Sequence, residues 1–511
     1  METLTPLAVG APVPQQGCRQ RTRPGLEPGV RAVHRSLRAG RIARRTFPLC
    51  SPARSSLPNA DMSFCFRPVV RGALLTGAVL IAPLPLQAQA PAALAADIAR
   101  RTEALNPKVV AWRRDLHEHP ELSNREVRTA ALVADHLRAL GIEVQTGVAH
   151  TGVVGILRGG KPGPVVALRA DMDALPVTEE VDLPFRSRAT AEYNGQTVGV
   201  MHACGHDAHT AILMGVAELL AGMKADIPGT VKFIFQPAEE GAPAGETGGA
   251  KLMIAEGVLD GPKPDAIFGL HVFPFDVGAI RYRPEGLMAS SDIVRIVVRG
   301  RQTHGAMPWS GVDPIVASAQ IINGLQTIVS RQVDLTASPA IVTIGSIQGG
   351  VRNNIVPDSV VMLGTIRTFD QAMRTQIHER VRTVAEQAAG ALGATAEVAI
   401  TMQTSVTYND PALTARMVPS LERAAGADRV ALGGFTTTAE DFSFFQERVP
   451  GLFVFLGVTP PDADPATVAP NHSPRFFVDE RALPVGVRTL SGLALDFLHG
   501  GAMPRGAAGS Q

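Results

Sequence analysis

The segment Met-His-Ala-Cys-Gly-His-Asp-Ala-His at 201–209 places three histidines and a cysteine within nine positions, in a chain with only 13 histidines and 4 cysteines. Cysteine sulfur and imidazole nitrogen are ligands that a borderline-soft divalent metal prefers. Gly205 allows a backbone turn tight enough for neighbouring side chains to converge on one ion. The segment therefore indicates a metal site, and a chance cluster is the alternative.

A pair of adjacent carboxylates, Glu239-Glu240, follows the run 231–235, which is apolar except for Lys232, and a proline. Neighbouring residues at a strand end point to different sides, so one carboxylate could bind a metal while the other faces a substrate. A solvated acidic turn is the alternative reading of such a pair.

Five side chains then become candidate ligands, enough for two metal ions. Two ions about 3.5 to 4 Å apart can lower the pKa of a shared water and polarise a carbonyl at once, and amide hydrolysis is the natural use of that chemistry. The candidates are Cys204, His206, Glu240, His271 and His472. By contrast, His117 and His119 are two residues apart on an expected helix and face different directions, which favours structural roles.

The elements that must position these residues alternate between helix and strand. Such alternation predicts an α/β fold with a mostly parallel sheet flanked by helices, and ligands gather beyond the carboxyl ends of its strands. Asp171, Glu239, Glu240 and His271 each come at or after the end of an expected strand. Ser123 and Glu126 have the spacing of a capping box for the second helix. The expected helices are 97–117, 126–140 and 208–223, and the expected strands are 152–157, 165–169, 231–235, 266–270 and 451–457.

A different pattern begins near residue 290 and predicts an inserted α+β module of ferredoxin-like order, β-α-β-β-α-β. The catalytic domain would then consist of two pieces, 95–288 and 403–502, with the module at 289–402 between them. Within the module, strands are expected at 293–298, 341–347, 360–368 and 395–401, and helices at 313–331 and 371–392.

The N-terminal region has two parts of different composition. Residues 1–61 contain ten arginines, three acidic residues and no amphipathic period, which is typical of disorder. Residues 62–90 have the pattern of a secretory signal peptide, with Arg67 and Arg71, a short proline-broken apolar run, and small residues at a cleavage site after Ala90. We expect translation to start at Met62 and the product to be periplasmic or secreted. An Arg-rich organelle-targeting leader is the alternative.

Charge and cysteine content exclude several partners for the remaining chain. The whole chain has a net charge of +1 and residues 1–90 contribute +9, so residues 91–511 carry −8. An acidic protein of this kind is not expected to bind nucleic acid or an anionic membrane. Cys204 is the only cysteine after residue 90, so no internal disulfide is possible there. Metal ligation would explain this thiol, and burial as a small hydrophobic residue is the alternative.

Several segments together resemble those of a known family, the metal-dependent aminoacylase and carboxypeptidase amidohydrolases. The similar branch contains hippurate hydrolase, N-acyl-L-amino acid amidohydrolases and indole-acetyl-amino-acid hydrolases. The segments run in family order over roughly residues 100–500, and jointly they are specific. They are 114–123, 169–176, 201–209, 236–240, 269–271, 303–306, 354–358, 439–442 and 471–474.

The resemblance implies roles for individual residues. The five candidate ligands would hold two divalent ions, usually zinc, manganese or a similar metal. Glu239 would be the general base that takes a proton from water and returns it to the leaving amine. His304 would reach a catalytic site, that of a partner subunit, and stabilise the oxyanion. Asn354, with Arg352 less directly, would hold the substrate carboxylate. The inserted module would be a lid and dimerisation domain, which makes a homodimer or higher homo-oligomer the expected state.

Other polar residues near these motifs are expected outside the ligand set. The family places His202 and His209 beside the ligands, with His209 supporting or capping and His202 unassigned. Asp171 stands where related branches carry a metal-binding histidine, and Asp173 could orient a ligand imidazole. Glu440 and Asp441 would support the site or begin a helix.

The expected function is hydrolysis of an N-acyl-amino acid, with a hippurate-like aromatic acyl group as one option, to a carboxylic acid and an amino acid. A dipeptidase or carboxypeptidase on the same scaffold is the alternative enzyme. A silent binding protein is the alternative of another class, and Glu239 argues against it because a binder needs no second carboxylate beside the ligand.

Overall fold

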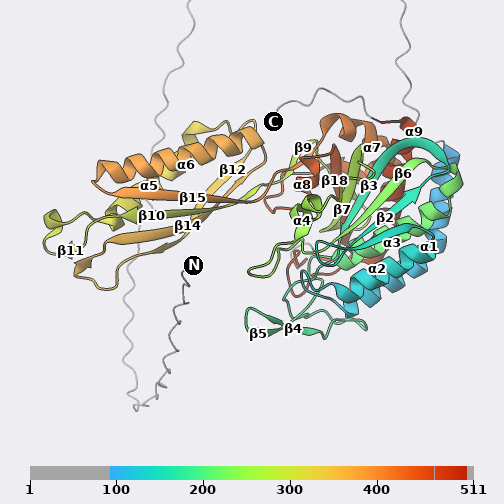
Figure 1. The fold of residues 1–511 in the computed structure, drawn as a ribbon, viewed down its shortest axis with the longest axis horizontal. Coiled ribbons are helices and arrows are strands. Elements are labelled where there is room, and N and C mark those ends of the chain that lie inside the picture. Colours follow the sequence, from blue (N-terminus) through green and yellow to red (C-terminus); the bar gives the residue numbers. More distant parts are fainter. Residues whose placement is uncertain (1–91, 465–466, 503–511) are drawn as a thin grey trace, which may run out of the picture. The chain divides into compact units, whose positions relative to one another are not determined.

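The computed structural model describes residues 92–464 and 467–502 (Figure 1). The predicted extension at 1–61 and signal peptide at 62–90 lie outside the described residues. Within the described ranges, no helix is long and apolar enough to cross a membrane.

A large mixed sheet of eight strands forms the centre of one part of the fold (Figure 1). Its four middle strands, β6, β3, β7 and β18, run parallel, as predicted for the core of the sheet. Antiparallel pairs appear on both sides of them, β2 against β6 and β8 against β18. In order across the sheet, the strands are β1 (Glu143–Val148), β2 (Gly152–Arg158), β6 (Pro228–Gln236), β3 (Lys161–Asp171), β7 (Ala266–Asp276), β18 (Gly451–Thr459), β8 (Ile280–Tyr282) and β17 (Val430–Leu432).

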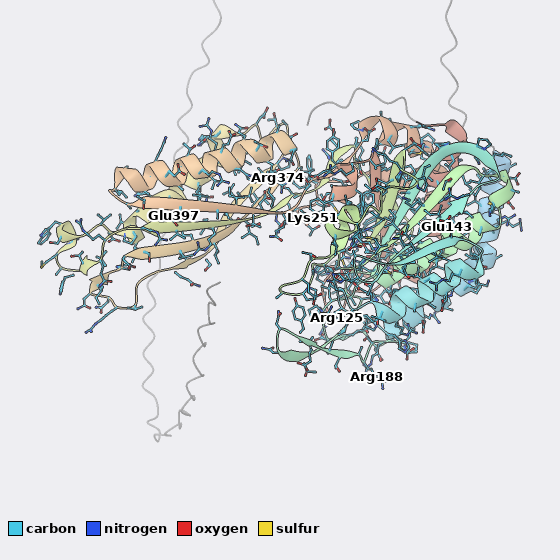
Figure 2. All side chains as sticks on the ribbon, in the orientation of Figure 1. Arg125, Glu143, Arg188, Lys251, Arg374 and Glu397 are labelled. Atoms are coloured by element: carbon cyan, nitrogen blue, oxygen red, sulfur yellow. The ribbon has the colours of Figure 1, made fainter. Side chains whose placement is uncertain are left out.

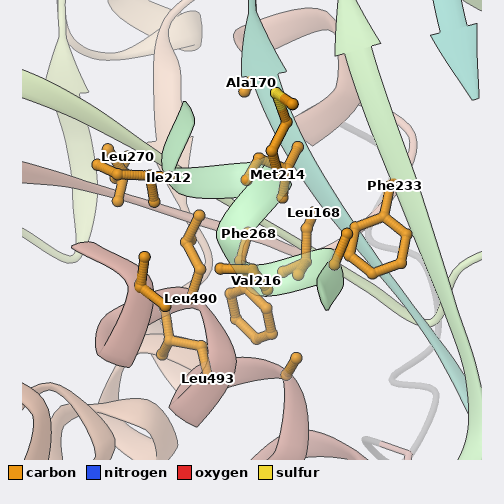
Figure 3. Close-up of a cluster of buried hydrophobic side chains, with 14 of the residues drawn as sticks. Leu168, Ala170, Ile212, Met214, Val216, Phe233, Phe268, Leu270, Leu490 and Leu493 are labelled. Carbon is orange, nitrogen blue, oxygen red and sulfur yellow. The ribbon is translucent and has the colours of Figure 1, made fainter. Parts of the chain in front are cut away.

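Helices cover both faces of this sheet, which explains why its middle strands are buried along most of their length. On one face, α3 and α9 pack their apolar residues against β3, β6 and β7, as Figure 3 shows for Ile212, Val216 and Leu490. A smaller apolar cluster that includes residues of α4 and α8 covers the opposite face. The helices are α1 (Ala92–Glu118), α2 (Val127–Ala139), α3 (His206–Ala221), α4 (Gly249–Ala255), α7 (Pro411–Ala425), α8 (Ser443–Gln446) and α9 (Leu483–Gly500).

The second part of the fold is a four-stranded antiparallel sheet in the order β12-β14-β10-β15. Helices α5 and α6 pack on one of its faces and share a separate hydrophobic core with it. Asp313 and Asp370 cap these two helices by accepting backbone N–H bonds. The predicted β-α-β-β-α-β order is confirmed. The elements are β10 (Ser291–Arg299), α5 (Pro314–Thr327), β12 (Ala340–Gln348), β14 (Ser359–Thr368), α6 (Gln371–Ala391) and β15 (Thr395–Thr404).

Short elements connect these parts. One hairpin, β4 with β5, and two further pairs, β11 with β13 and β9 with β16, lie outside the two main sheets. They are β4 (Thr190–Tyr193), β5 (Gln196–Gly199), β9 (Glu285–Met288), β11 (Thr303–His304), β13 (Ile355–Val356) and β16 (Thr407–Asn409). The single-turn segments are η1 (Lys224–Asp226), η2 (Pro308–Ser310), η4 (Ala427–Arg429), η5 (Glu480–Ala482) and the π-helical η3 (Ile328–Gln332).

Three local predictions were wrong. The Ser123 and Glu126 side chains form no capping box, because Ser123 donates to Asp173 and Glu126 accepts from the N–H of Ala238. His271 does not end its strand, since β7 continues to Asp276 alongside β18. The helix expected at 313–331 stops being α-helical after Thr327 and widens into the π-helical η3.

Candidate metal centre and active site

A glycine turn before α3 positions Cys204 and His206. Gly205 has a φ of 94°, and a Cβ there would lie 2.3 Å from Cγ2 of Val272. Only glycine fits both the left-handed backbone and the contact. The predicted role of Gly205 in a tight turn is therefore confirmed.

The five predicted ligands lie together at one end of the parallel strands. Cys204 Sγ is 3.3 Å from Nε2 of His271, and Nε2 of His472 is 3.1 Å from Oε1 of Glu240. Nε2 of His206 is 3.9 Å from the same Glu240 oxygen. Donor atoms within 4.8 Å of one another form two groups that share the thiol, Cys204 with His206 and His271, and Cys204 with Glu240 and His472.

The hydrogen bonds of two buried imidazoles leave one nitrogen free toward this cluster. Nδ1 of His206 donates to Asp173 at 3.2 Å, and Nε2 of His206 has no hydrogen-bond partner among the described residues. Nδ1 of His271 donates to the carbonyl of Val272 at 2.7 Å, while its Nε2 faces the thiol. Metal-ligating histidines have this arrangement. The sulfur, nitrogen and oxygen donors present therefore fit divalent cations such as zinc.

Three other histidines of the motifs, His209, His117 and His119, do not have a free nitrogen facing the cluster. Nδ1 of His209 donates to Asp171 at 2.5 Å, and its Nε2 accepts the N–H of Val272 at 2.8 Å. His117 lies between Asp207 at 2.7 Å and Glu179 at 3.1 Å. His119 is exposed and bonds to a carbonyl of its own helix.

His202 is also buried, but its environment is different. It is 2% exposed, and neither ring nitrogen has a hydrogen-bond partner among the described residues. Burial lowers the pKa of His202 to about 4, so its ring is neutral.

Glu239 and Cys204 resist ionisation in this setting. Burial, with help from Glu440 and Glu240, raises the pKa of Glu239 well above its usual range. Burial and Glu240 likewise raise the pKa of the Cys204 thiol. Bound cations invert this preference, because they favour thiolate and carboxylate. The electrostatics are thus those of a site suited to positive charge.

Arg169 is the main supporting residue that the sequence reasoning missed. Its guanidinium is fully buried and ion-paired to Asp171 at 2.6 Å, Glu440 at 2.9 Å and Asp441 at 3.1 Å. It also donates to Gln236 at 2.8 Å. The signal was present, because an arginine inside the apolar run 165–170 needs buried partners.

The loop that carries His472 is tied to the thiol by Asn471. Its amide donates to the carbonyls of Cys204 at 3.0 Å and Val272 at 3.2 Å. The backbone N–H of His472 donates to Ala203 at 2.8 Å, and its φ of 68° is unusual for a residue other than glycine. The backbone thus holds His472 beside Glu240.

A cavity of about 1060 Å³ opens onto these residues. One part of its lining is apolar, with Leu252, Phe273, Met288 and Phe444. Two cations also line it, Lys251 (Figure 2) and Arg367. Lys251 donates to the carbonyl of Gln403 at 3.0 Å, whereas Arg367 is half-buried and makes no ion pair within the described ranges. No sequence motif pointed to Arg367, which lies on strand β14 of the second sheet.

The structure does not bring His304, Arg352 and Asn354 to this cavity, because none of them is among its lining residues in the described chain. His304 lies on β11, and its Nδ1 accepts the N–H of Ala306 at 3.0 Å. Asn354 is its neighbour, since the carbonyl of Asn354 accepts the N–H of Gly305 at 2.8 Å. Their roles toward substrate remain predictions.

Residues 167–496 match peptidase family M20/M25/M40, which is more than half of the chain. The chain belongs to this family. The resemblance inferred from the motifs is confirmed, and this M20/M25/M40 peptidase is a hydrolase with the mixed α/β fold expected for it.

The match to each of the following relatives spans nearly the whole length of that relative. Thermostable carboxypeptidase 2 of Saccharolobus solfataricus is 42% identical over 397 residues, which are 76% of this chain and 95% of the relative. N-acetylcysteine deacetylase of Bacillus subtilis is 39% identical over 405 residues, 78% of this chain and 98% of the relative. A solved structure of the Bacillus subtilis YXEP protein, described as a dinuclear metal-binding peptidase of family M20, is similar with a TM-score of 0.64 and 37% identity, over 77% of this chain and 98% of that chain.

Proposed function

We propose that this M20/M25/M40 family member hydrolyses the amide bond of N-acyl-amino acids and releases a carboxylic acid and an amino acid. Two divalent cations, such as zinc or manganese, would be held by Cys204, His206, Glu240, His271 and His472. The observation that carries the proposal is a second half-buried carboxylate, Glu239, beside Glu240 in a cavity lined by four of these ligands.

When bound, the cations would polarise the scissile carbonyl and make water a stronger nucleophile at neutral pH. Glu239 would take the proton from the attacking water and pass it to the leaving amine nitrogen. The N–H of Asp441 donates to Oε1 of Glu239 at 3.3 Å, which leaves the other carboxylate oxygen for this transfer. Arg169 balances the charge of Glu440 and Asp441 and so supports the base.

Two features of the cavity support an N-acyl-amino acid as substrate. Arg367 lines the cavity and could pair with the carboxylate of the amino-acid half. Asn354 and Arg352, predicted for the same role, do not line this cavity within the described chain. The apolar wall of Phe273, Met288 and Phe444 suits an apolar acyl group, including an aromatic one as in hippurate.

A dipeptidase or carboxypeptidase is the second candidate, since a relative named as a carboxypeptidase is 42% identical. A hydrolysis panel on metal-loaded protein separates the two. It would compare benzoyl, aromatic-acetyl and aliphatic acyl groups on several amino acids with a set of dipeptides. Faster turnover of dipeptides than of every acyl-amino acid would favour the second candidate.

The base is tested by Glu239→Gln, which keeps the shape of the side chain and removes its basicity. We expect kcat to fall by about 10²- to 10⁴-fold, the usual contribution of a general base, while two equivalents of Zn²⁺ remain bound. Metal content and kcat are measured on the same preparation, and chelator-treated protein serves as the zero point. Full turnover by the Glu239→Gln variant would rule out Glu239 as the general base. Full turnover by chelator-treated protein would rule out metal-dependent catalysis.

We further propose a homodimer in which His304 completes the partner's active site. His304 is exposed, and Trp309, which is 78% exposed, lies five residues after it. Val351 is 98% exposed and lies four residues before Ile355, the residue that pairs with His304 between β13 and β11. Such a surface suits contact with a second copy.

We also propose that the protein is exported to the periplasm or the medium, because residues 62–90 have the pattern of a signal peptide. The mature protein would begin at Pro91 if cleavage follows Ala90. N-terminal sequencing of the exported form tests this, and an N-terminus inside residues 1–61 would contradict it.

A further inference from the structure

The turn that presents Glu239 and Glu240 has a strained backbone. Ala238 is 2% exposed and has a φ of 53°, in the left-handed region that side-chain-bearing residues avoid. It follows directly after β6 and Pro237. Something outside the turn must hold this conformation, because the local sequence disfavours it.

Glu126 supplies one such contact. Its side chain is fully buried, and Oε1 accepts the N–H of Ala238 at 2.9 Å. The hydroxyl of Thr151 donates to the other carboxylate oxygen at 2.5 Å. Glu126 is the residue before α2, yet its side chain makes no capping bond to that helix.

Asp173 holds the other end of the same turn. Its Oδ2 accepts the N–H of Glu240 at 3.0 Å and the hydroxyl of Ser123 at 2.7 Å. The segment 123–126 therefore reaches both ends of the turn, directly through Glu126 and through Asp173 by way of Ser123. Although Ser123 and Glu126 have the spacing of a capping box, their side chains support the turn at 238–240 and do not cap α2.

We propose that Glu126 is a positioning residue that fixes the turn at 238–240 and thereby aims Glu239 at substrate and Glu240 at the metal site. The inference rests on the proposed function of those two carboxylates. Both oxygens of the Glu126 side chain accept hydrogen bonds, one from Ala238 and one from Thr151, so the side chain is fixed and can hold a strained turn. Without it, Ala238 is free to relax to negative φ and rotate both carboxylates away.

A purely structural role in α2 is the competing explanation, and the chain offers a matched control. Glu121 lies in the same region, and its two oxygens accept the N–H groups of Arg128 at 3.0 Å and Thr129 at 2.8 Å in the first turn of α2. Removing Glu121 therefore weakens the helix start without touching the turn at 238–240.

The experiment compares Glu126→Ala with Glu121→Ala in the full protein. For E126A we expect kcat to fall about 30- to 100-fold with KM within about threefold, because the reacting groups are misplaced while the pocket persists. The Zn²⁺ affinity, measured by competition with a chromophoric chelator, should fall about tenfold. E121A should lower the melting temperature and leave kcat and Zn²⁺ affinity within about twofold of wild type.

Two further variants test the turn itself. Glu126→Gln keeps an oxygen that can accept from Ala238, so its kcat should stay within about fivefold of wild type. Ala238→Gly removes the penalty of positive φ, so the double variant E126A/A238G should recover kcat about fivefold or more over E126A.

Equal kcat and Zn²⁺ affinity in E126A and E121A would overturn the proposal, as would no recovery in the double variant. If E126A does not fold, Glu126→Asp replaces it, since the shorter side chain cannot reach both Thr151 and Ala238. Failure of the proposed function would be distinct, because wild-type protein would then turn over no acyl-amino acid while the Zn²⁺ measurement still tests the turn.

Discussion

Asp173 shows how one buried side chain can organise a candidate metal site at the residue scale. It accepts from the imidazole of His206 at 3.2 Å and from the N–H of Glu240 at 3.0 Å, so it contacts two of the five proposed ligands. It thereby selects the ring nitrogen of His206 that points at the cluster. Its own oxygens are taken up by these donors, which suits support of ligands and not ligation.

We expect Asp173→Ala to lower the affinity for Zn²⁺ about 10- to 100-fold, as for other residues that orient metal ligands. Chelator competition measures this affinity, and circular dichroism shows whether the fold persists. The exposed Asp182 gives a matched control, and Asp182→Ala should bind Zn²⁺ like wild type. Unchanged Zn²⁺ affinity in D173A would show that His206 needs no such partner.

At the element scale, the start of α3 depends on Gly205. We expect Gly205→Ala to lower the free energy of unfolding by about 2 to 5 kcal/mol, since strain from positive φ adds to overpacking against Val272. Urea unfolding measures the loss. Gly195 has a φ of 75° and no atom within 4 Å of a built Cβ, so Gly195→Ala carries the strain alone. Equal losses in the two variants would remove the steric part of the argument.

A second feature at the element scale is a buried cluster around Arg374, which links the first and last strands of the second sheet. Asp292, near the start of β10, is fully buried and binds Arg374 (Figure 2) at 3.1 Å and His378 at 2.7 Å. Arg374 also donates to the carbonyl of Thr404 at 2.9 Å and the hydroxyl of Ser405 at 3.2 Å, where the chain leaves the sheet. One guanidinium thus connects the entering and leaving strands.

This cluster predicts a pH dependence of stability. Burial raises the pKa of Asp292, but His378 and Arg374 outweigh it and leave the pKa below its usual value. A lowered carboxyl pKa contributes stability above the unfolded value of about 3.9, and that stability is lost as the pH falls through the folded pKa. Asp292→Asn should cost about 3 to 5 kcal/mol at pH 7, because it leaves Arg374 buried without its partner.

Urea unfolding at pH 7 and pH 3.5 measures this difference. The unfolding free energies of wild type and D292N should approach each other at the lower pH, since only wild type has the carboxylate to lose. A constant difference between the two proteins across this range would contradict the prediction. The exposed pair of Arg299 and Glu397 is a control, because exposed ion pairs contribute only about 0 to 1 kcal/mol.

At the scale of the whole molecule, the proposed dimer predicts complementation between inactive subunits. Co-expressed Glu239→Ala and His304→Ala subunits should regain about a quarter of wild-type activity, because half of the dimers are mixed and each mixed dimer has one intact site. Two different affinity tags isolate the mixed dimer for assay. If both residues act within one subunit, mixed dimers stay inactive, and a monomeric protein would remove the dimer proposal.

Much of this molecule follows from local patterns. The alternation of apolar strands and amphipathic helices predicts the parallel sheet, and the period change near residue 290 predicts the second sheet with its two helices. Residue types also predict the donor set, because sulfur, imidazole and carboxylate at Cys204, His206 and Glu240 suit one class of cation. These inferences need only neighbours in sequence.

Long-range contacts decide the rest. Within 201–209, spacing cannot distinguish His206 from His209, and only the bond from the distant Val272 occupies the second nitrogen of His209. Ser123 and Glu126 have the spacing of a helix cap, yet their partners Asp173 and Ala238 lie 50 and 112 residues away. The sequence by itself determined which groups could bind and react. The tertiary structure decided which of them are free to do so, because a polar atom that is already hydrogen-bonded in the core is no longer available as a ligand.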